Sequence, residues 1–134
     1  MEYVTDTHPL LWNLFTPKRL GRAAFAVFRE VDRGNAKLYA PAIVVSEMLM
    51  VIEKVRIPNA TMPDLLDEID LMQLSPYHEL LPLWPATAVT SRTLTSIPDI
   101  FDRLIVAEAL RLGLPLITHD SVITNSGLVN VVWG

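Results

Sequence analysis

Short apolar runs alternate along the chain with longer segments in which apolar residues recur every three or four positions. The short runs have the length of buried β-strands, and the longer segments have the period of helices that bury one face. This alternation predicts an α/β fold, a short parallel sheet covered on both faces by helices. The predicted strands span 2–5, 37–39, 79–83, 114–118 and 129–133, and the predicted helices span 8–15, 16–33, 43–52, 62–74, 85–94 and 99–112.

Local signals support several of these boundaries. Thr7 is a residue type that caps helices and stands before the first helical pattern. Gly113 follows the last helical pattern, as is usual at a helix end. The segment 43–52 is apolar almost all round, so we interpret it as a buried helix, although its β-branched first residues also permit a strand. Residues 56–59 are expected to break it.

Composition indicates a globular protein. The chain has 134 residues, of which 51% are hydrophobic and 19% are charged, and this length fits one domain with a sizeable core. There is no cysteine, which excludes disulfides, thiolate zinc sites and cysteine nucleophiles. The first residues lack the basic start of a signal peptide, and no apolar run approaches the roughly 18 residues of a membrane span. We therefore expect a soluble, cytoplasmic protein.

The net charge of −4 argues against an ordinary nucleic-acid binder, which would neutralise phosphates with lysine and arginine. A cluster of carboxylates that binds divalent cations changes this argument, because the cation can contact phosphate. Arg19, Arg22, Arg29 and Arg33 fall in one predicted helix and could form a basic patch. A solvated helix face is an equally good interpretation of these four residues.

Five acidic residues are candidates for a functional site. Asp6 and Asp120 follow predicted strands, and ligands of parallel sheets bind beyond these carboxyl ends. Glu47 lies within an apolar helix, where an unpaired carboxylate is costly to bury. Asp99 and Asp102 are three residues apart and share a helix face. If the five converge, a hard divalent cation would balance their charge. The simpler interpretations are helix caps, compensation of a helix dipole, and a narrow polar stripe.

Five segments of the chain stand out as motifs. They are VTDTHPLLW at 4–12, SE at 46–47, DIFDRLIVA at 99–107, LITHD at 116–120 and VVW at 131–133. These segments resemble motifs of PIN-domain proteins. The segment at 99–107 departs from the family form DPFDRLLIA in having Ile100 where proline is usual. The resemblance covers nearly the whole chain, which would then be a single PIN-like domain over 1–134.

The resemblance implies a metal-dependent endoribonuclease that is similar to the VapC-like toxins of bacterial toxin–antitoxin pairs. It implies Mg²⁺ or Mn²⁺ as the cofactor, RNA as the substrate, a homodimer, and a cognate antitoxin that occludes the cleft. Thr118 would be an accessory hydroxyl, and substrate choice would lie in 62–92, which matches no family motif. The implied catalytic residues are Asp6, Glu47, Asp102 and Asp120, and the implied metal ligands are these four and Asp99.

Other residues near these motifs have two interpretations each. A strand would turn the side chain of His119 away from that of the next residue, so we do not expect His119 to act in catalysis. Arg103 is expected either to contact phosphate or to pair with a neighbouring acid. Trp12, Trp84 and Trp133 could stack on bases, although packing in the core or in a dimer is the simpler use.

The main alternative function is a PIN-like module that binds RNA or protein without cleavage, which would leave the presence of all five acids without a reason. An acid-rich phosphotransfer or haloacid-dehalogenase-like fold would need a second acid beside Asp6 at the first strand end, and this chain has only one there. No GxxxxGK[ST] phosphate loop is present, which excludes ordinary nucleoside triphosphate hydrolysis.

Overall fold

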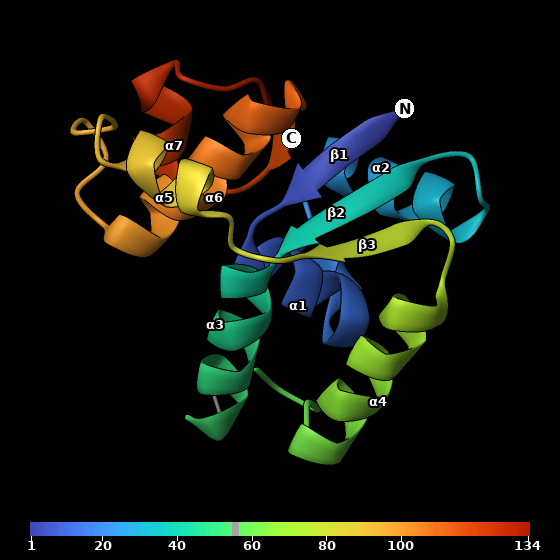
Figure 1. Ribbon diagram of the computed structural model, residues 1–134. Coiled ribbons are helices and arrows are strands. Elements are labelled where there is room, and N and C mark those ends of the chain that lie inside the picture. Colours follow the sequence, from blue (N-terminus) through green and yellow to red (C-terminus); the bar gives the residue numbers. More distant parts are fainter. Residues whose placement is uncertain (55–56) are drawn as a thin grey trace.

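A parallel sheet forms the centre of the computed structural model, which describes residues 1–54 and 57–134 (Figure 1). The strand order within the described residues is β3-β2-β1-β4-β5, and every pair of neighbours is parallel. The predicted α/β class is therefore confirmed. The strands are β1 Glu2–Thr5, β2 Lys37–Pro41, β3 His78–Leu81, β4 Leu116–Ile117 and β5 Val131–Val132.

Helices connect the strands. Figure 1 shows α3 and α4 side by side at the bottom of the view, and α5, α6 and α7 grouped at its upper left. Within the described residues, no helix has the length and apolarity of a membrane span. The helices are α1 Thr7–Phe15, α2 Arg22–Asp32, α3 Ala42–Glu53, α4 Met62–Leu74, α5 Pro85–Ser91, α6 Ile100–Leu112 and α7 Ser121–Ser126, with a 3₁₀ turn at Pro17–Arg19.

The register between β1 and β4 determines which loops meet. Val4 pairs with Leu116 and Thr5 pairs with Ile117. Because both strands run in the same direction, the residues that follow them leave the sheet at the same edge. The loop that begins at Asp6 therefore lies beside the loop that follows β4.

The core is apolar and draws on every layer of the fold. Val4 of β1, Leu11 of α1, Met48 of α3 and Ile105 of α6 are all completely buried. Each such side chain contributes about 1.5–3 kcal/mol to stability by leaving water. The segment 43–52 is a helix, as predicted, but it is fully buried on one face only, through Val44, Met48, Val51 and Ile52, because α1, α4 and α6 contact it there and leave Met50 43% exposed.

One charged side chain is buried outside the apolar core. Glu108 of α6 is only 2% exposed, and its carboxylate accepts a hydrogen bond of 2.9 Å from the hydroxyl of Thr87 in α5. The guanidinium of Arg111 donates to the other carboxylate oxygen. A buried carboxylate needs such partners, so this group fixes α5 against α6.

The predicted helix 16–33 is wrong in its first part. The chain forms a 3₁₀ turn at Pro17–Arg19, and α2 starts only after Gly21. A Cβ atom on Gly21 would lie 2.3 Å from the carbonyl oxygen of Trp133. The N–H of Ala24 donates to that same carbonyl at 3.0 Å. The free N–H groups at the start of α2 thus bind the C-terminal segment, a long-range contact that interrupts the helix.

Element ends also differ from the prediction. Thr7 is the first residue of α1 and not its cap, because the side chain of Asp6 accepts the hydrogen bond from the N–H of Thr7. Strands β4 and β5 have two residues each and are shorter than predicted. The sequence pattern did not predict α7, a short polar helix capped by Asp120.

The predicted break of α3 at 56–59 lies partly outside the described residues, because Arg56 is not among them. Helix α3 ends at Glu53, and Lys54 follows as its C-terminal cap. Asn59 adopts a φ of 65°, a left-handed conformation that asparagine tolerates better than most residues and that suits a turn. The described part of this segment therefore agrees with a break before α4.

We predict that Gly21→Ala lowers the free energy of unfolding by about 1–3 kcal/mol, because the new methyl group collides with the main chain of Trp133. The φ of Gly21 is −64°, which alanine adopts readily, so backbone strain does not contribute. Urea denaturation measures the loss, and tryptophan fluorescence reports displacement of Trp133.

Gly113→Ala is the matched control. Gly113 has a φ of 68° and nothing lies within 4 Å of a Cβ there, so this change costs only about 1–2 kcal/mol of backbone strain. The native fluorescence should stay unchanged in this variant. Equal native fluorescence in both variants would contradict the close contact between Gly21 and Trp133.

Candidate functional site

Asp6 is held in place at the carboxyl end of β1. Its N–H donates to the carbonyl of Ile117 at 2.9 Å, which extends the pairing of β1 with β4. The N–H of Thr7 donates to Oδ1 of Asp6 at 2.8 Å, and the hydroxyl of Thr118 donates to Oδ2 at 2.7 Å. Asp6 therefore caps α1, as the simpler interpretation of the sequence proposed, and also has a fixed orientation.

The same threonine positions Asp120. The N–H of Asp120 donates to the hydroxyl oxygen of Thr118 at 3.0 Å, and Oδ1 of Asp120 accepts a hydrogen bond of 2.8 Å from the N–H of Ile123. Thr118 itself is completely buried. One buried hydroxyl thus links the two acids at the strand ends, where the resemblance implied an accessory group.

Glu47 reaches the same region from α3. Its Oε1 accepts a hydrogen bond of 2.8 Å from the hydroxyl of Thr7. Thr7 therefore contacts two of the candidate acids, with its N–H on Asp6 and its hydroxyl on Glu47. Sequence reasoning identified Thr7 only as a helix cap, although its place directly after Asp6 was a usable signal.

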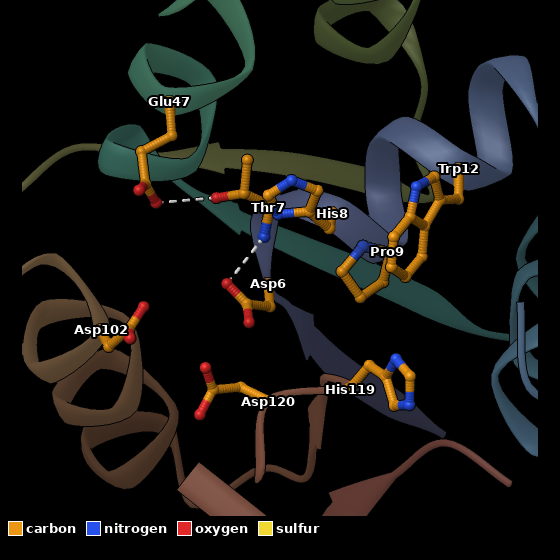
Figure 2. Close-up of a pocket in the computed structure, with 9 residues that line it drawn as sticks. All are labelled: Asp6, Thr7, His8, Pro9, Trp12, Glu47, Asp102, His119 and Asp120. Carbon is orange, nitrogen blue, oxygen red and sulfur yellow. Dashed lines mark hydrogen bonds between the residues drawn. The ribbon is translucent and has the colours of Figure 1, made fainter. Parts of the chain in front are cut away.

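Asp102 and Asp99 have different positions at the start of α6. Asp102 is partly buried and faces the other acids across a pocket (Figure 2). Asp99 is exposed and does not line that pocket. Its Oδ1 accepts hydrogen bonds from the N–H groups of Phe101 and Asp102 at 2.8 and 3.0 Å. Asp99 is thus the N-cap of α6, which is the simpler of its two interpretations.

The four remaining acids line one cavity of about 450 Å³. Figure 2 shows two sides to this cavity, with the carboxylates of Glu47, Asp102 and Asp120 on one side and aromatic rings on the other. Asp6 lies between the two sides. The lining residues are Asp6, Thr7, His8, Pro9, Trp12, Glu47, Asp102, His119 and Asp120.

Asp102 has a strongly raised pKa. Burial, together with the negative charges of Asp6, Asp99, Asp120 and Glu47, raises the pKa of Asp102 from 3.8 to about 7. Burial disfavours a carboxylate because it removes water, and nearby negative charges act in the same direction. At neutral pH this site therefore holds more negative charge than it can stabilise by itself.

Two further acids have pKa values that are raised in the same way. Burial raises the pKa of Asp6, and hydrogen bonds from Thr118 and Thr7 oppose this effect. Burial also raises the pKa of Glu47, again against the hydrogen bond from Thr7. Among the described residues, no lysine or arginine forms an ion pair with any of the four acids in the cavity.

The carboxylates surround the cavity without forming a closed cage. In residues 1–54 and 57–134, no three histidine, aspartate or glutamate side chains are close enough to be a ready-made metal site. A cage of this kind is not required for Mg²⁺, which typically takes one or two protein carboxylates and fills its remaining positions with water and substrate phosphate.

Three of the basic residues considered above have structural partners. Arg103 donates from Nε to the carbonyl of Ile97, so it holds the segment before α6 and neither expected use applies to this contact. Arg29 pairs with Asp32, and Arg33 pairs with Glu30, at 3.0 and 2.9 Å. These two arginines favour the interpretation of a solvated helix face.

The aromatic side of the cavity was not predicted as a unit. His119 points away from Asp120, as expected, and stacks against Trp133 (Figure 2 shows its direction). Trp12 and Trp133 lie together although 121 positions separate them in the chain. Trp84 is elsewhere, at the start of α5, and is 47% exposed.

The sequence and the fold of this chain are similar to those of known proteins. A family model described as the PIN domain matches residues 3–125. This chain belongs to the PIN domain family. The match spans all four acids in the cavity, so the resemblance inferred from the sequence motifs is confirmed at the level of the family. None of the curated proteins matches this PIN domain by sequence.

Solved structures share the fold at low sequence identity. A chain of VapBC2 from Rickettsia felis, bound to a promoter DNA fragment, has a TM-score of 0.71 and 14% identity, with 98% of this chain and 97% of that chain covered. FitAcB from Neisseria gonorrhoeae has a TM-score of 0.66 and 18% identity, with 96% of this chain and 95% of that chain covered. DNA-bound VapBC from Salmonella typhimurium has a TM-score of 0.66 and 12% identity, with 98% of this chain and 96% of that chain covered.

We predict that this PIN domain, without metal, loses stability as the pH rises from about 4 to about 7. Folded Asp102 keeps its proton up to a pKa of about 7, whereas the unfolded carboxyl loses it near 3.8. Asp102→Asn removes this effect and should be more stable than the unchanged protein above pH 7. The expected gain is on the order of 1 kcal/mol, since solvent screens a partly exposed site. Thermal unfolding in EDTA at pH 5 and pH 8 measures it.

Asp99→Asn serves as the control, because asparagine caps a helix as well as aspartate does. It removes one of the charges near Asp102 but leaves that carboxyl in place, so its gain above pH 7 should be smaller. A stability difference between Asp102→Asn and the unchanged protein that does not vary with pH would contradict the raised pKa.

Proposed function

We propose that this PIN domain is a metal-dependent endoribonuclease that hydrolyses phosphodiester bonds in RNA. The observation that carries the proposal is the cavity lined by Asp6, Glu47, Asp102 and Asp120, for which the described residues supply no lysine or arginine partner. A protein keeps such a site folded at neutral pH only at a cost. Binding of a divalent cation would remove that cost.

The chemistry of these side chains fits Mg²⁺ or Mn²⁺. All four are carboxylates, and hard cations prefer oxygen ligands. The chain has no cysteine that would favour zinc. Asp6 and Asp120 would bind the ion directly, and Asp102 and Glu47 would hold it directly or through water. Asp99 enters the proposal through its charge and its cap and not as a ligand, because it lies outside the cavity.

When bound, the ion would supply a water of lowered pKa and a positive charge for the phosphate oxygens. The residues of this chain have their own tasks. Thr118 fixes the rotamer of Asp6 through its hydroxyl and the loop of Asp120 through its accepted N–H. Thr7 orients Asp6 through its N–H and Glu47 through its hydroxyl. In hydrolysis, the oxygen of water bonds to phosphorus as the bond to the leaving ribose oxygen breaks, and a carboxylate orients that water.

The proposal extends to the biological setting. The solved chains of the same fold come from the two-component complexes VapBC and FitAB. We propose that this PIN domain is the toxin of such a pair, with a cognate antitoxin that covers the cavity, and that it forms a homodimer. Helix α4 supports a protein partner, since Leu66, Leu71 and Leu74 are 49%, 61% and 83% exposed. Co-expression with the product of the adjacent open reading frame tests this part directly.

We predict that EDTA abolishes cleavage of RNA and that Mg²⁺ or Mn²⁺ restores it. Asp6→Asn and Asp102→Asn should each lower kcat by at least about a hundredfold while the protein stays folded, because each removes a charge that the ion needs. A fluorescent single-stranded RNA measures the rate, and circular dichroism checks the fold.

Asp67→Asn is the matched control, since Asp67 is an exposed acid of α4 that does not line the cavity. It should cleave RNA at the normal rate. Full activity after complete removal of metal would overturn the proposal. RNA binding without any cleavage at any metal concentration would favour the non-cleaving module.

We predict that Thr118→Val weakens metal affinity about 10- to 100-fold, as is typical for partners that orient metal ligands. Valine has nearly the shape of threonine but cannot donate to Asp6 or accept from Asp120. Isothermal titration with Mn²⁺ measures the affinity. Thr118→Ser keeps the hydroxyl and should restore most of it.

Thr93→Val is the control for the loss of a threonine hydroxyl, because Thr93 is exposed and its hydroxyl bonds only to the carbonyl of Thr90. Its metal affinity should equal that of the unchanged protein. If Thr118→Val bound Mn²⁺ as tightly as Thr93→Val, the positioning role of Thr118 would be wrong.

A further inference from the structure

Four aromatic side chains form a continuous cluster beside the acids. The rings of His119 and Trp133 are stacked, with centroids 4.4 Å apart and planes at 9°. Trp12 lies 5.7 Å from Trp133 and 5.5 Å from His8, in tilted arrangements. We call these four residues the aromatic wall. They come from α1, from the loop after β4 and from the end of the chain.

The aromatic wall lies between two cavities. His8, Trp12 and His119 line the acid-containing cavity, on the side away from Asp102 (Figure 2). His119 also lines a second cavity of about 570 Å³, together with Trp133. A phosphate held at the carboxylates would therefore have aromatic rings beside it in the same cavity and further aromatic surface in the second cavity.

The rings of the wall are accessible, unlike the rings of a core. His8 and His119 are exposed, and Trp12 and Trp133 are partly buried. By contrast, Phe28 of the true core is 1% exposed. Trp12 and Trp133 pack against the core on one side, which agrees with core packing as the simpler use of tryptophan, whereas the rings of His8 and His119 are open to solvent.

The main chain holds the wall in place. The carbonyl of Trp133 accepts the hydrogen bond from Ala24 at the start of α2, and Gly21 leaves room for it. The N–H of Thr118 donates to the carbonyl of Val132 at 3.3 Å. Residues that orient the acids and residues that orient the wall thus share the end of β4, which keeps the two at a fixed spacing.

The negative charge of the cavity and of the chain leaves few electrostatic contacts for a nucleic acid. None of the described residues that line the acid-containing cavity is a lysine or an arginine, and the chain as a whole carries a charge of −4. Contacts between basic side chains and phosphate, the usual source of affinity for nucleic acid, are therefore missing at this cavity. Stacking of bases on aromatic rings is the main alternative and does not depend on sequence.

We infer that the aromatic wall is a binding site for an unpaired nucleobase of the RNA, adjacent to the phosphate that is cleaved. This inference rests on the proposed function and adds a requirement to it. A base in a duplex is stacked on its neighbours and cannot reach the wall, so the site selects single-stranded RNA. The base would stack on the exposed ring of His119, which Trp133 supports from its other face, and the acids would hold the phosphate through the cation.

A binding experiment that does not need cleavage tests this inference. In the Asp6→Asn background with Mg²⁺, we measure the affinity for a 12-nucleotide single-stranded RNA, the same RNA as a duplex, and a set in which each position in turn is abasic. His119→Ala and Trp133→Leu should each weaken binding of the single strand roughly tenfold, the scale of one lost stacking contact. Trp84→Leu is the matched control and should bind normally, because Trp84 is exposed and lines neither cavity.

The abasic set gives the decisive comparison. One abasic position should weaken binding about tenfold in the Asp6→Asn protein and should make no difference once Trp133→Leu is added. His119→Ala keeps the test valid if Trp133→Leu fails to fold, because His119 is exposed. Equal binding of abasic and normal RNA at every position, or equal binding by His119→Ala and Trp84→Leu, would overturn the inference.

The result also separates this inference from the proposed function. If the unchanged protein cleaves RNA with Mg²⁺ while the abasic set shows no effect, the aromatic wall is wrong and the nuclease stands. If base-dependent binding is present but no metal restores cleavage to the unchanged protein, the nuclease is wrong and the wall still binds a base.

Discussion

The pairing of β1 with β4 is the constraint on which the rest of the site depends. It sets Thr5 beside Ile117, so that Asp6 and Thr118 leave the sheet together. The hydroxyl of Thr118 then joins Asp6 to the loop of Asp120. A shift of one residue in this register would turn Thr118 to the other face of the sheet and separate the two acids. The arrangement of the site therefore depends on the correct pairing of the central strands.

Three of the four acids in the cavity stand at the start of a helix. Asp6 caps α1 and Asp120 caps α7, and the first turn of α6 carries Asp102 just after its own cap. Helix starts favour negative charge because their N–H groups are unpaired. The fold can therefore bring several carboxylates close together at moderate cost. The residual cost appears as the raised pKa of Asp102, about 7, and it is the part that a cation can relieve.

In the proposed function, the aromatic wall and the acids would recognise two parts of the substrate. The carboxylates would contact phosphate through a cation, whereas a ring such as that of His119 would contact an unpaired base without one. Both groups are anchored on the same short strand end. The spacing between them is set by the sheet and not by flexible side chains, as precise positioning requires.

The sequence by itself determined most of the element types, with the exception of the 3₁₀ turn and α7, and the identity of the acids. Helix α4 begins and ends where the pattern predicted, because helical periodicity is a local property. The motif residues around Asp6, Glu47, Asp102 and Asp120 pointed to one family and one chemistry. Only the tertiary structure decided that Asp99 is a cap outside the cavity, that Thr7 binds Glu47, that Gly21 interrupts a helix for Trp133, and that Trp12 meets Trp133. These are contacts between distant parts of the chain, which depend on strand register and helix packing and leave no periodic signal in the sequence.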